Sequence, residues 1–144
     1  MAYREETIDP ELMHQTDVLA KLLHGRNASK EAVETLTRHL FGYEADINTD
    51  ACKKAAASLL AVLRHNEQQL KLKREIDPQR TPHISHGEIR LLRALIGDPE
   101  VPGSGKNLKD ILKELHRKPG LKKLTMEDVR DKVESILWKL VPAS

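Results

Sequence analysis

Cysteine is nearly absent from the chain, because Cys52 is the single cysteine among 144 residues. An internal disulfide and a metal site built from several cysteines are therefore excluded, and this composition favours a reducing compartment. We expect a cytoplasmic protein. The chain also lacks an apolar run of about 18 residues, and its first residues lack the apolar core of a signal peptide, so we expect no membrane segment.

Aromatic residues are also scarce, at 3% of the chain. Single-stranded nucleic acids usually stack their bases on aromatic side chains, so the composition disfavours that mode of binding. Hydrophobic residues still make up 39% of the chain and charged residues 32%, which is a balance typical of folded globular domains. Aliphatic side chains must therefore supply most of the core.

No segment shows the alternating pattern of a β-strand, whereas helix start signals are frequent. Where such a signal is followed by apolar residues at three- to four-residue spacing, the pattern predicts a helix. Ser85 and Glu88, for example, form a capping box at the start of the fourth predicted helix. The predicted helices with their start and stop residues are Asp9-Pro10 to Gly25, Ser29 to Gly42, Thr49 or Asp50 to Ile76, Ser85 to Ile96, Asn107 to Pro119-Gly120, and Thr125 to Leu140.

We therefore expect an all-α fold, a compact bundle of about six helices. The pair Asp77-Pro78 ends the third and longest helix, because a residue that precedes proline avoids the helical region. This break divides the chain into an N-terminal three-helix part over residues 1–77, a linker over 78–84, and a C-terminal trihelical part over 85–144. We expect the two parts to form one folded unit.

The longest predicted helix carries an apolar seam with the spacing of a coiled coil. We interpret the seam as core that packs on the first two helices, and the alternative is contact with a second copy of the chain. Within the seam, Asn66 and Leu70 are candidate protein-interface residues, since a polar residue in a seam can fix its register. The seam consists of Cys52, Ala56, Leu59, Leu63, Asn66 and Leu70.

The formal net charge of the chain is only +2, but positive charge is concentrated in the segment 106–123. Residues 1–77 carry 11 Lys and Arg against 13 Asp and Glu, whereas residues 78–144 carry 13 against 9. A basic patch attracts phosphates or an acidic protein face, and the alternative is an ordinary solvated helix and loop. The candidate nucleic-acid contacts are Lys106, Lys109, Lys113, Arg117, Lys118, Lys122 and Lys123.

The three predicted helices over residues 85–140 resemble, in length and order, the trihelical core of helix-turn-helix and winged-helix DNA-binding domains. The resemblance makes Thr125–Leu140 the recognition helix, whose first residues normally meet base edges in the major groove. In this chain Glu127, Asp128 and Asp131 occupy that position, and carboxylates repel phosphates. We therefore expect the lysines of 106–123 to make any nucleic-acid contact, to the backbone rather than to bases.

The stretch Asp98–Asn107, DPEVPGSGKN, ends like a phosphate-binding loop but departs from its pattern. The pattern GxxxxGK[ST] requires glycine where this chain has Glu100, and serine or threonine where it has Asn107. A strand should also precede the loop, and a helix is predicted there instead. We interpret the stretch as an interhelical loop.

We expect neither an enzyme nor a cofactor or metal site. His83 and His86 have a spacing found in metal sites, but zinc needs three or four ligands and no cysteine or acidic cluster lies nearby. Cys52 lies in the seam of the longest helix, where we interpret it as a small core residue rather than a nucleophile.

Trp138 lies just outside the apolar stripe of the last predicted helix. It is either a core residue or an exposed anchor for a protein partner, and it joins Asn66 and Leu70 as a candidate interface residue. Two functions stay open. The first, which we favour narrowly, is a non-enzymatic regulatory or accessory subunit of nucleic-acid machinery, and the second is a protein adaptor with no nucleic-acid contact.

Overall fold

The computed structural model describes residues 10–23, 28–76, 84–102, 108–117, 119–120 and 124–142. The described residues form six α-helices and no β-strand, so the all-α fold class predicted from the sequence is confirmed. In chain order the helices are α1 (Pro10–Leu23), α2 (Lys30–Leu40), α3 (Asp50–Ile76), α4 (His86–Ile96), α5 (Leu108–Arg117) and α6 (Met126–Lys139).

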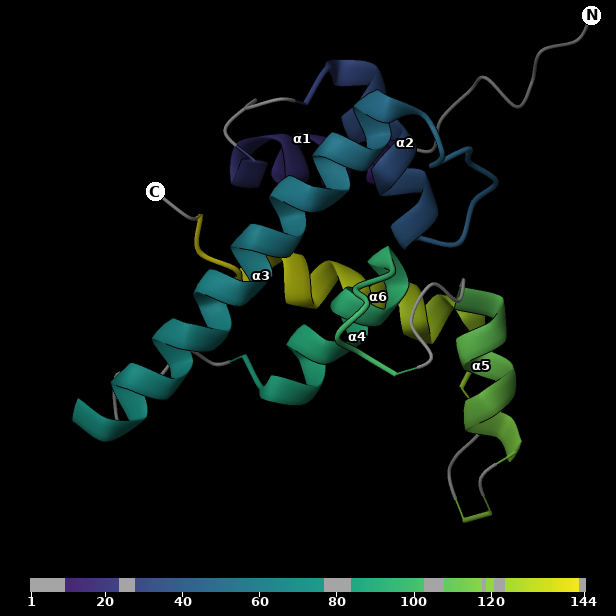
Figure 1. Ribbon diagram of the computed structural model, residues 1–144. Coiled ribbons are helices and arrows are strands. Elements are labelled where there is room, and N and C mark those ends of the chain that lie inside the picture. The colour runs from purple at the N-terminus through teal and green to yellow at the C-terminus, as the bar shows by residue number, and fades with distance from the viewer. Residues whose placement is uncertain are drawn as a thin grey trace, which may run out of the picture.

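The long helix α3 crosses the molecule diagonally in Figure 1. It packs against α1 and α2 and also against α4, whereas α6 packs against α1, α4 and α5. One cluster of buried hydrophobic residues includes side chains from every described helix, such as Leu59 of α3 and Val133 of α6. Side chains that precede the predicted linker therefore share a core with side chains that follow it. Residues 77–83 lie outside the described residues.

Three of the predicted start signals, Ser29, Ser85 and Thr125, act as helix caps. The Ser29 side chain accepts a hydrogen bond from the N–H of Ala32 at 3.1 Å. Ser85 and Glu88 form the predicted capping box of α4, and Thr125 forms an equivalent box at the start of α6. These side chains pair backbone groups that a helix terminus otherwise leaves without partners. Asp9, Gly25, Asp77-Pro78 and Asn107, which were predicted as further start and stop residues, lie outside the described residues.

Gly42 ends α2 in a conformation that favours glycine, with a φ of 83°. A Cβ atom at this position would lie 2.9 Å from Cε of Met126 and 3.1 Å from Cδ1 of Leu108. The predicted stop residue is therefore also the place where α5 and α6 approach the end of α2. This contact joins helices that are far apart in the sequence.

Candidate functional site

Three of the predicted nucleic-acid contacts lie on α5, where they form one exposed row. Lys109, Lys113 and Arg117 are four residues apart, and all three are exposed. Residues at this spacing lie on the same side of a helix, so the three cations share one stripe. The other predicted contacts, Lys106, Lys118, Lys122 and Lys123, lie outside the described residues.

The packing of α5 turns this row towards solvent. The helix stands at the edge of the molecule in Figure 1 and packs on α6. Leu108 is fully buried, and Ile111 and Leu112 are half-buried, so one side of α5 belongs to the core. Near the end of the helix, Nε2 of His116 lies 2.8 Å from the backbone oxygen of Leu124. The cationic row is thus a supported, solvent-facing stripe that can attract anions.

Asn66 and Leu70, which were predicted as interface residues, are buried within the chain instead. Leu70 is fully buried, and Asn66 is 2% exposed. Nδ2 of Asn66 donates to the backbone oxygens of Val62 and Val141 at 2.8 Å, and Oδ1 accepts from the N–H of Val141 at 2.9 Å. Neither side chain is presented to a partner in this structure. Asn66 instead ties α3 to the segment that follows α6.

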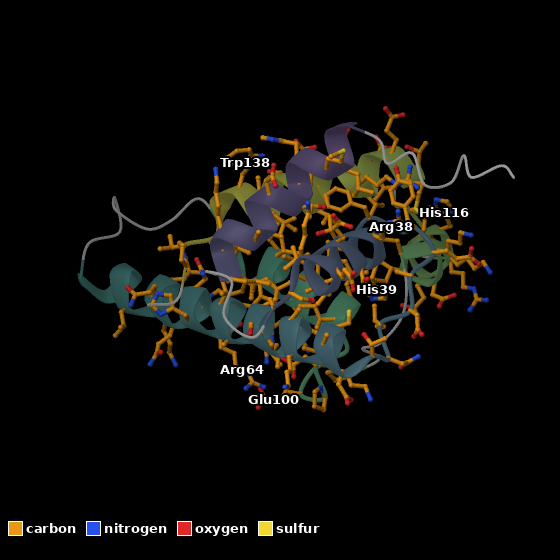
Figure 2. All side chains as sticks on the ribbon, turned by 90° about the horizontal axis from the view of Figure 1, so that it is seen from above. Arg38, His39, Arg64, Glu100, His116 and Trp138 are labelled. Carbon is orange, nitrogen blue, oxygen red and sulfur yellow. The ribbon has the colours of Figure 1, made fainter. Side chains whose placement is uncertain are left out.

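Trp138 is exposed, which decides between the two positions considered for it from the sequence. The indole is 57% exposed. In Figure 2 it lies on the opposite side of the molecule from Arg64 and Glu100. The His14 ring of α1 lies beside it, with ring centroids 5.5 Å apart and planes tilted by 40°. Trp138 is therefore a surface residue held against α1.

The orientation of Trp138 follows from the register of α6. Val129, Val133, Ile136 and Leu137 are buried, so this side of the helix faces the core. Trp138 follows Leu137 and lies about 100° further round the helix, beyond the buried side. The core therefore fixes the helix so that the indole cannot turn inwards without displacing Leu137.

A groove of about 250 Å³ lies beside the indole, between α1 and the end of α6. Val18 and Leu22 come from α1, and Leu140 and Pro142 come from the segment tied down by Asn66. The remaining lining residues are His14, Asp17, Lys21, Leu137 and Trp138 itself. The groove thus has an apolar interior with a few polar groups, which is the composition of many binding sites.

A buried charge cluster that the sequence interpretation missed lies around Arg93 of α4. Its Nε donates to Asp98 at 2.6 Å, and its other nitrogens reach Glu100 at 2.9 Å and Glu67 at 3.3 Å. The hydrogen bond that Arg93 donates to Asp98 raises the pKa of Arg93. Burial opposes ionisation of Asp98, but hydrogen bonds from the Glu100 N–H and from Arg93 lower its pKa. The start of the stretch DPEVPGSGKN therefore serves to fix the turn after α4.

A second missed cluster joins α4 to α6 through Glu88. One carboxylate oxygen accepts from Nζ of Lys132 and from Nζ of Lys139, both at 3.0 Å. Burial opposes ionisation of this carboxyl, but the hydrogen bonds from Lys132, from the Ser85 N–H and from Lys139 outweigh it and lower the pKa of Glu88 to about 2. The same residue therefore caps α4 and links it to the helix that carries Trp138.

Cys52 is fully buried. Burial raises the pKa of its thiol, and the nearby Asp46 carboxylate raises this pKa further. The thiolate, which is the form that acts as a nucleophile, is therefore disfavoured. Within the described ranges, no three His, Cys, Asp or Glu side chains are arranged to hold a metal ion. Of the helices in the described part of the chain, none is long and apolar enough to cross a membrane.

No protein-family model, curated protein or solved structure matches this chain.

Proposed function

We propose that this protein is a non-enzymatic helical adaptor that binds another protein through the surface around Trp138. The observation that carries the proposal is the exposure of this indole beside an apolar groove. Tryptophan is enriched among the residues that contribute most to protein interfaces. A large indole held at the surface by a fixed helix, next to a groove that can accept an apolar side chain, supports an anchor function.

The surroundings of the groove fit a protein partner. Asp17 and Lys21 of α1 place opposite charges among the apolar residues of the lining. A protein interface commonly has such an arrangement, with an apolar centre and polar groups around it. Because His14 lies beside the indole, the ring is held in place before the partner arrives, so less side-chain entropy is lost on binding.

Replacing Trp138 with alanine is expected to weaken binding of the partner by about tenfold or more. The partner is first captured from the native host with the unaltered chain and is then titrated in purified form. Leu72→Ala is the matched control, because Leu72 is an exposed aliphatic residue of α3 outside the groove. Trp138 is the single tryptophan, so its fluorescence reports directly on the site. Equal affinity of the Trp138→Ala variant and the unaltered chain, or unchanged indole emission on binding, refutes the proposal.

A second candidate function is supported by the cationic row of α5. We propose that this row contacts nucleic-acid phosphates, so that the adaptor acts as a regulatory or accessory subunit of nucleic-acid machinery in the cytoplasm. Lys109, Lys113 and Arg117 are all exposed on one stripe, and cations in this arrangement bind backbone rather than read base sequence. Such binding weakens steeply as salt concentration rises.

Changing Lys109, Lys113 and Arg117 together to glutamine is expected to lower affinity for a labelled DNA or RNA by about tenfold at low salt. Fluorescence anisotropy over a salt series measures the effect. The control changes Lys53, Lys54 and Lys71 of α3 to glutamine, which removes the same charge from other exposed positions. If both triple variants lose affinity equally, net charge rather than the row explains the binding. If the unaltered chain shows no salt-sensitive binding, this candidate is lost.

A further inference from the structure

A second cavity lies between α1 and α6, beside the turn that follows α2. Its volume is about 260 Å³. Leu12 and Phe41 contribute buried apolar walls, and Tyr43 stands at the rim with 38% of its surface exposed. The cavity uses the first part of α6, whereas the Trp138 groove uses its last part, so the two follow one another where α1 meets α6. They share no lining residue.

The wall of this cavity contains a polar side chain without a partner. Gln15 of α1 is fully buried, and neither Nε2 nor Oε1 has a hydrogen-bond partner among the described residues. A buried amide in this condition is unfavourable and uncommon in folded proteins. An apolar residue at this position would be more stable. A glutamine here is therefore better explained if its amide binds a ligand.

The charges around the cavity indicate the sign of that ligand. Glu127, Asp131 and Glu134 line it from successive turns of α6, and none of them has an ion-pair partner among the described residues. Among the described lining residues Arg130 is the one cation, and its guanidinium already has contacts within the chain. Its Nε donates to the backbone oxygen of Phe41 at 2.8 Å, and its guanidinium lies 4.6 Å from the centre of the Tyr43 ring.

We propose that this cavity binds a small organic cation, an alkylammonium or alkylguanidinium group. Such groups carry hydrogen-bond donors and no acceptor, which suits the carboxylates of α6 and Oε1 of Gln15. The alkyl part lies against Leu12 and Phe41. Because both amide atoms of Gln15 are shielded from solvent, the cation reaches Oε1 only after a lining side chain shifts.

Two sources can supply this cation, and both have the same chemistry. It is either a free amine or guanidine, or the side chain of a lysine or arginine in a partner that also occupies the neighbouring Trp138 groove. The cation site itself does not rest on the adaptor function, because Trp138 is absent from the cavity lining. Trp138→Ala is therefore expected to leave cation binding unchanged even where it abolishes partner binding.

The test is a nuclear magnetic resonance titration that follows the side-chain amide of Gln15. The probes are butylammonium and butylguanidinium chloride, and tetramethylammonium chloride is the control with the same charge and no N–H donor. We expect saturable shifts of the Gln15 side-chain amide with a butyl probe and none with tetramethylammonium. Acetyl-lysine amide and acetyl-arginine amide, which carry the same cations beside backbone amides, are the probes that distinguish the sources. Binding of these about tenfold tighter than the butyl probes identifies a protein side chain, and equal or weaker binding identifies a free cation.

Two variants separate a ligand site from a merely structural amide. Gln15→Met is expected to raise the urea midpoint of unfolding, because it removes the unpaired amide, and to weaken cation binding by about tenfold. Glu134→Gln is expected to preserve the fold and to weaken cation binding as well. Asp17→Asn, in the neighbouring Trp138 groove, is expected to leave cation binding unchanged. Absence of saturable shifts with every N–H probe overturns the proposal. The proposal is also overturned if the Gln15→Met chain is stabilised but binds the cation with the affinity of the unaltered protein. The same holds if the Glu134→Gln chain binds the cation with unaltered affinity.

Discussion

Replacing Arg93 with methionine is expected to lower the free energy of unfolding by about 3 kcal/mol, because the change removes the nearest cation from a buried carboxylate. The side chain of Asp98 is 0% exposed, and Arg93 lies 2.6 Å from it. Methionine keeps the aliphatic volume of arginine, so the loss is electrostatic rather than a packing defect. Arg64 also approaches Asp98, at 3.6 Å, but its side chain is 50% exposed and compensates in part. Urea unfolding followed by circular dichroism measures the difference.

Arg90→Met is the matched control for this change. Arg90 lies on the same helix as Arg93 but is exposed, and it has no ion-pair partner among the described residues. We expect its replacement to change the free energy of unfolding by about 0.5 kcal/mol or less. If the two variants are equally stable, the hydrogen bond from the Glu100 N–H to Asp98 is sufficient to hold the buried carboxylate.

The helices could be predicted because their signals are local. Ser29, Ser85 and Thr125 each begin a helix by accepting a hydrogen bond from a backbone N–H three residues later, and this pairing is encoded in four adjacent residues. The stop at Gly42 is local as well, since its backbone requires a positive φ. Neither signal depends on the neighbouring helices, which is why the predicted bounds agree with the described ones.

The charge clusters could not be predicted, because their members meet only after the helices pack. Glu67 lies on α3 and Arg93 on α4, and no spacing in the sequence relates them. The five-residue interval from Arg93 to Asp98 spans a helix end, so helical periodicity does not place the two side chains together. A sequence signal did exist in Asp98 directly after Gly97, because a carboxylate there can order a turn.

Asn66 and Trp138, both predicted as interface residues, differ in burial. Both lie on helices with apolar stripes, and the stripe alone cannot tell which flanking residue is covered. The segment after α6 returns to α3 and covers Asn66, with Val141 pairing its amide. Nothing described covers Trp138 to the same extent, since it is 57% exposed. Trp138 therefore remains a candidate interface residue. Asn66 does not reach the surface, and it holds the segment after α6 that lines the Trp138 groove.

Acidification is expected to remove on the order of 3 kcal/mol of stability through Glu88 alone. The pKa of this carboxyl is about 2 in the folded chain against an ordinary value of 4.5. Because the folded-state pKa is the lower one, the contribution is fully present above pH 4.5 and is lost as the pH falls from there towards about 2. Urea midpoints of unfolding are measured across this pH range for the unaltered chain and for Glu88→Gln. The difference between the two profiles gives the contribution of the Glu88 charge.

Glu88→Gln is suited to this test because glutamine can still accept the hydrogen bond from the Ser85 N–H and so preserve the capping box. What it removes is the negative charge that Lys132 and Lys139 share. The variant should be less stable than the unaltered chain near neutral pH and approach it in stability at the acid end. Glu31→Gln, which changes an exposed first-turn acid of α2, should run parallel to the unaltered chain throughout. A Glu88→Gln profile that is also parallel would mean that the two lysines do not hold α6 to α4, and the position of Trp138 would then depend on the apolar stripe and on Asn66.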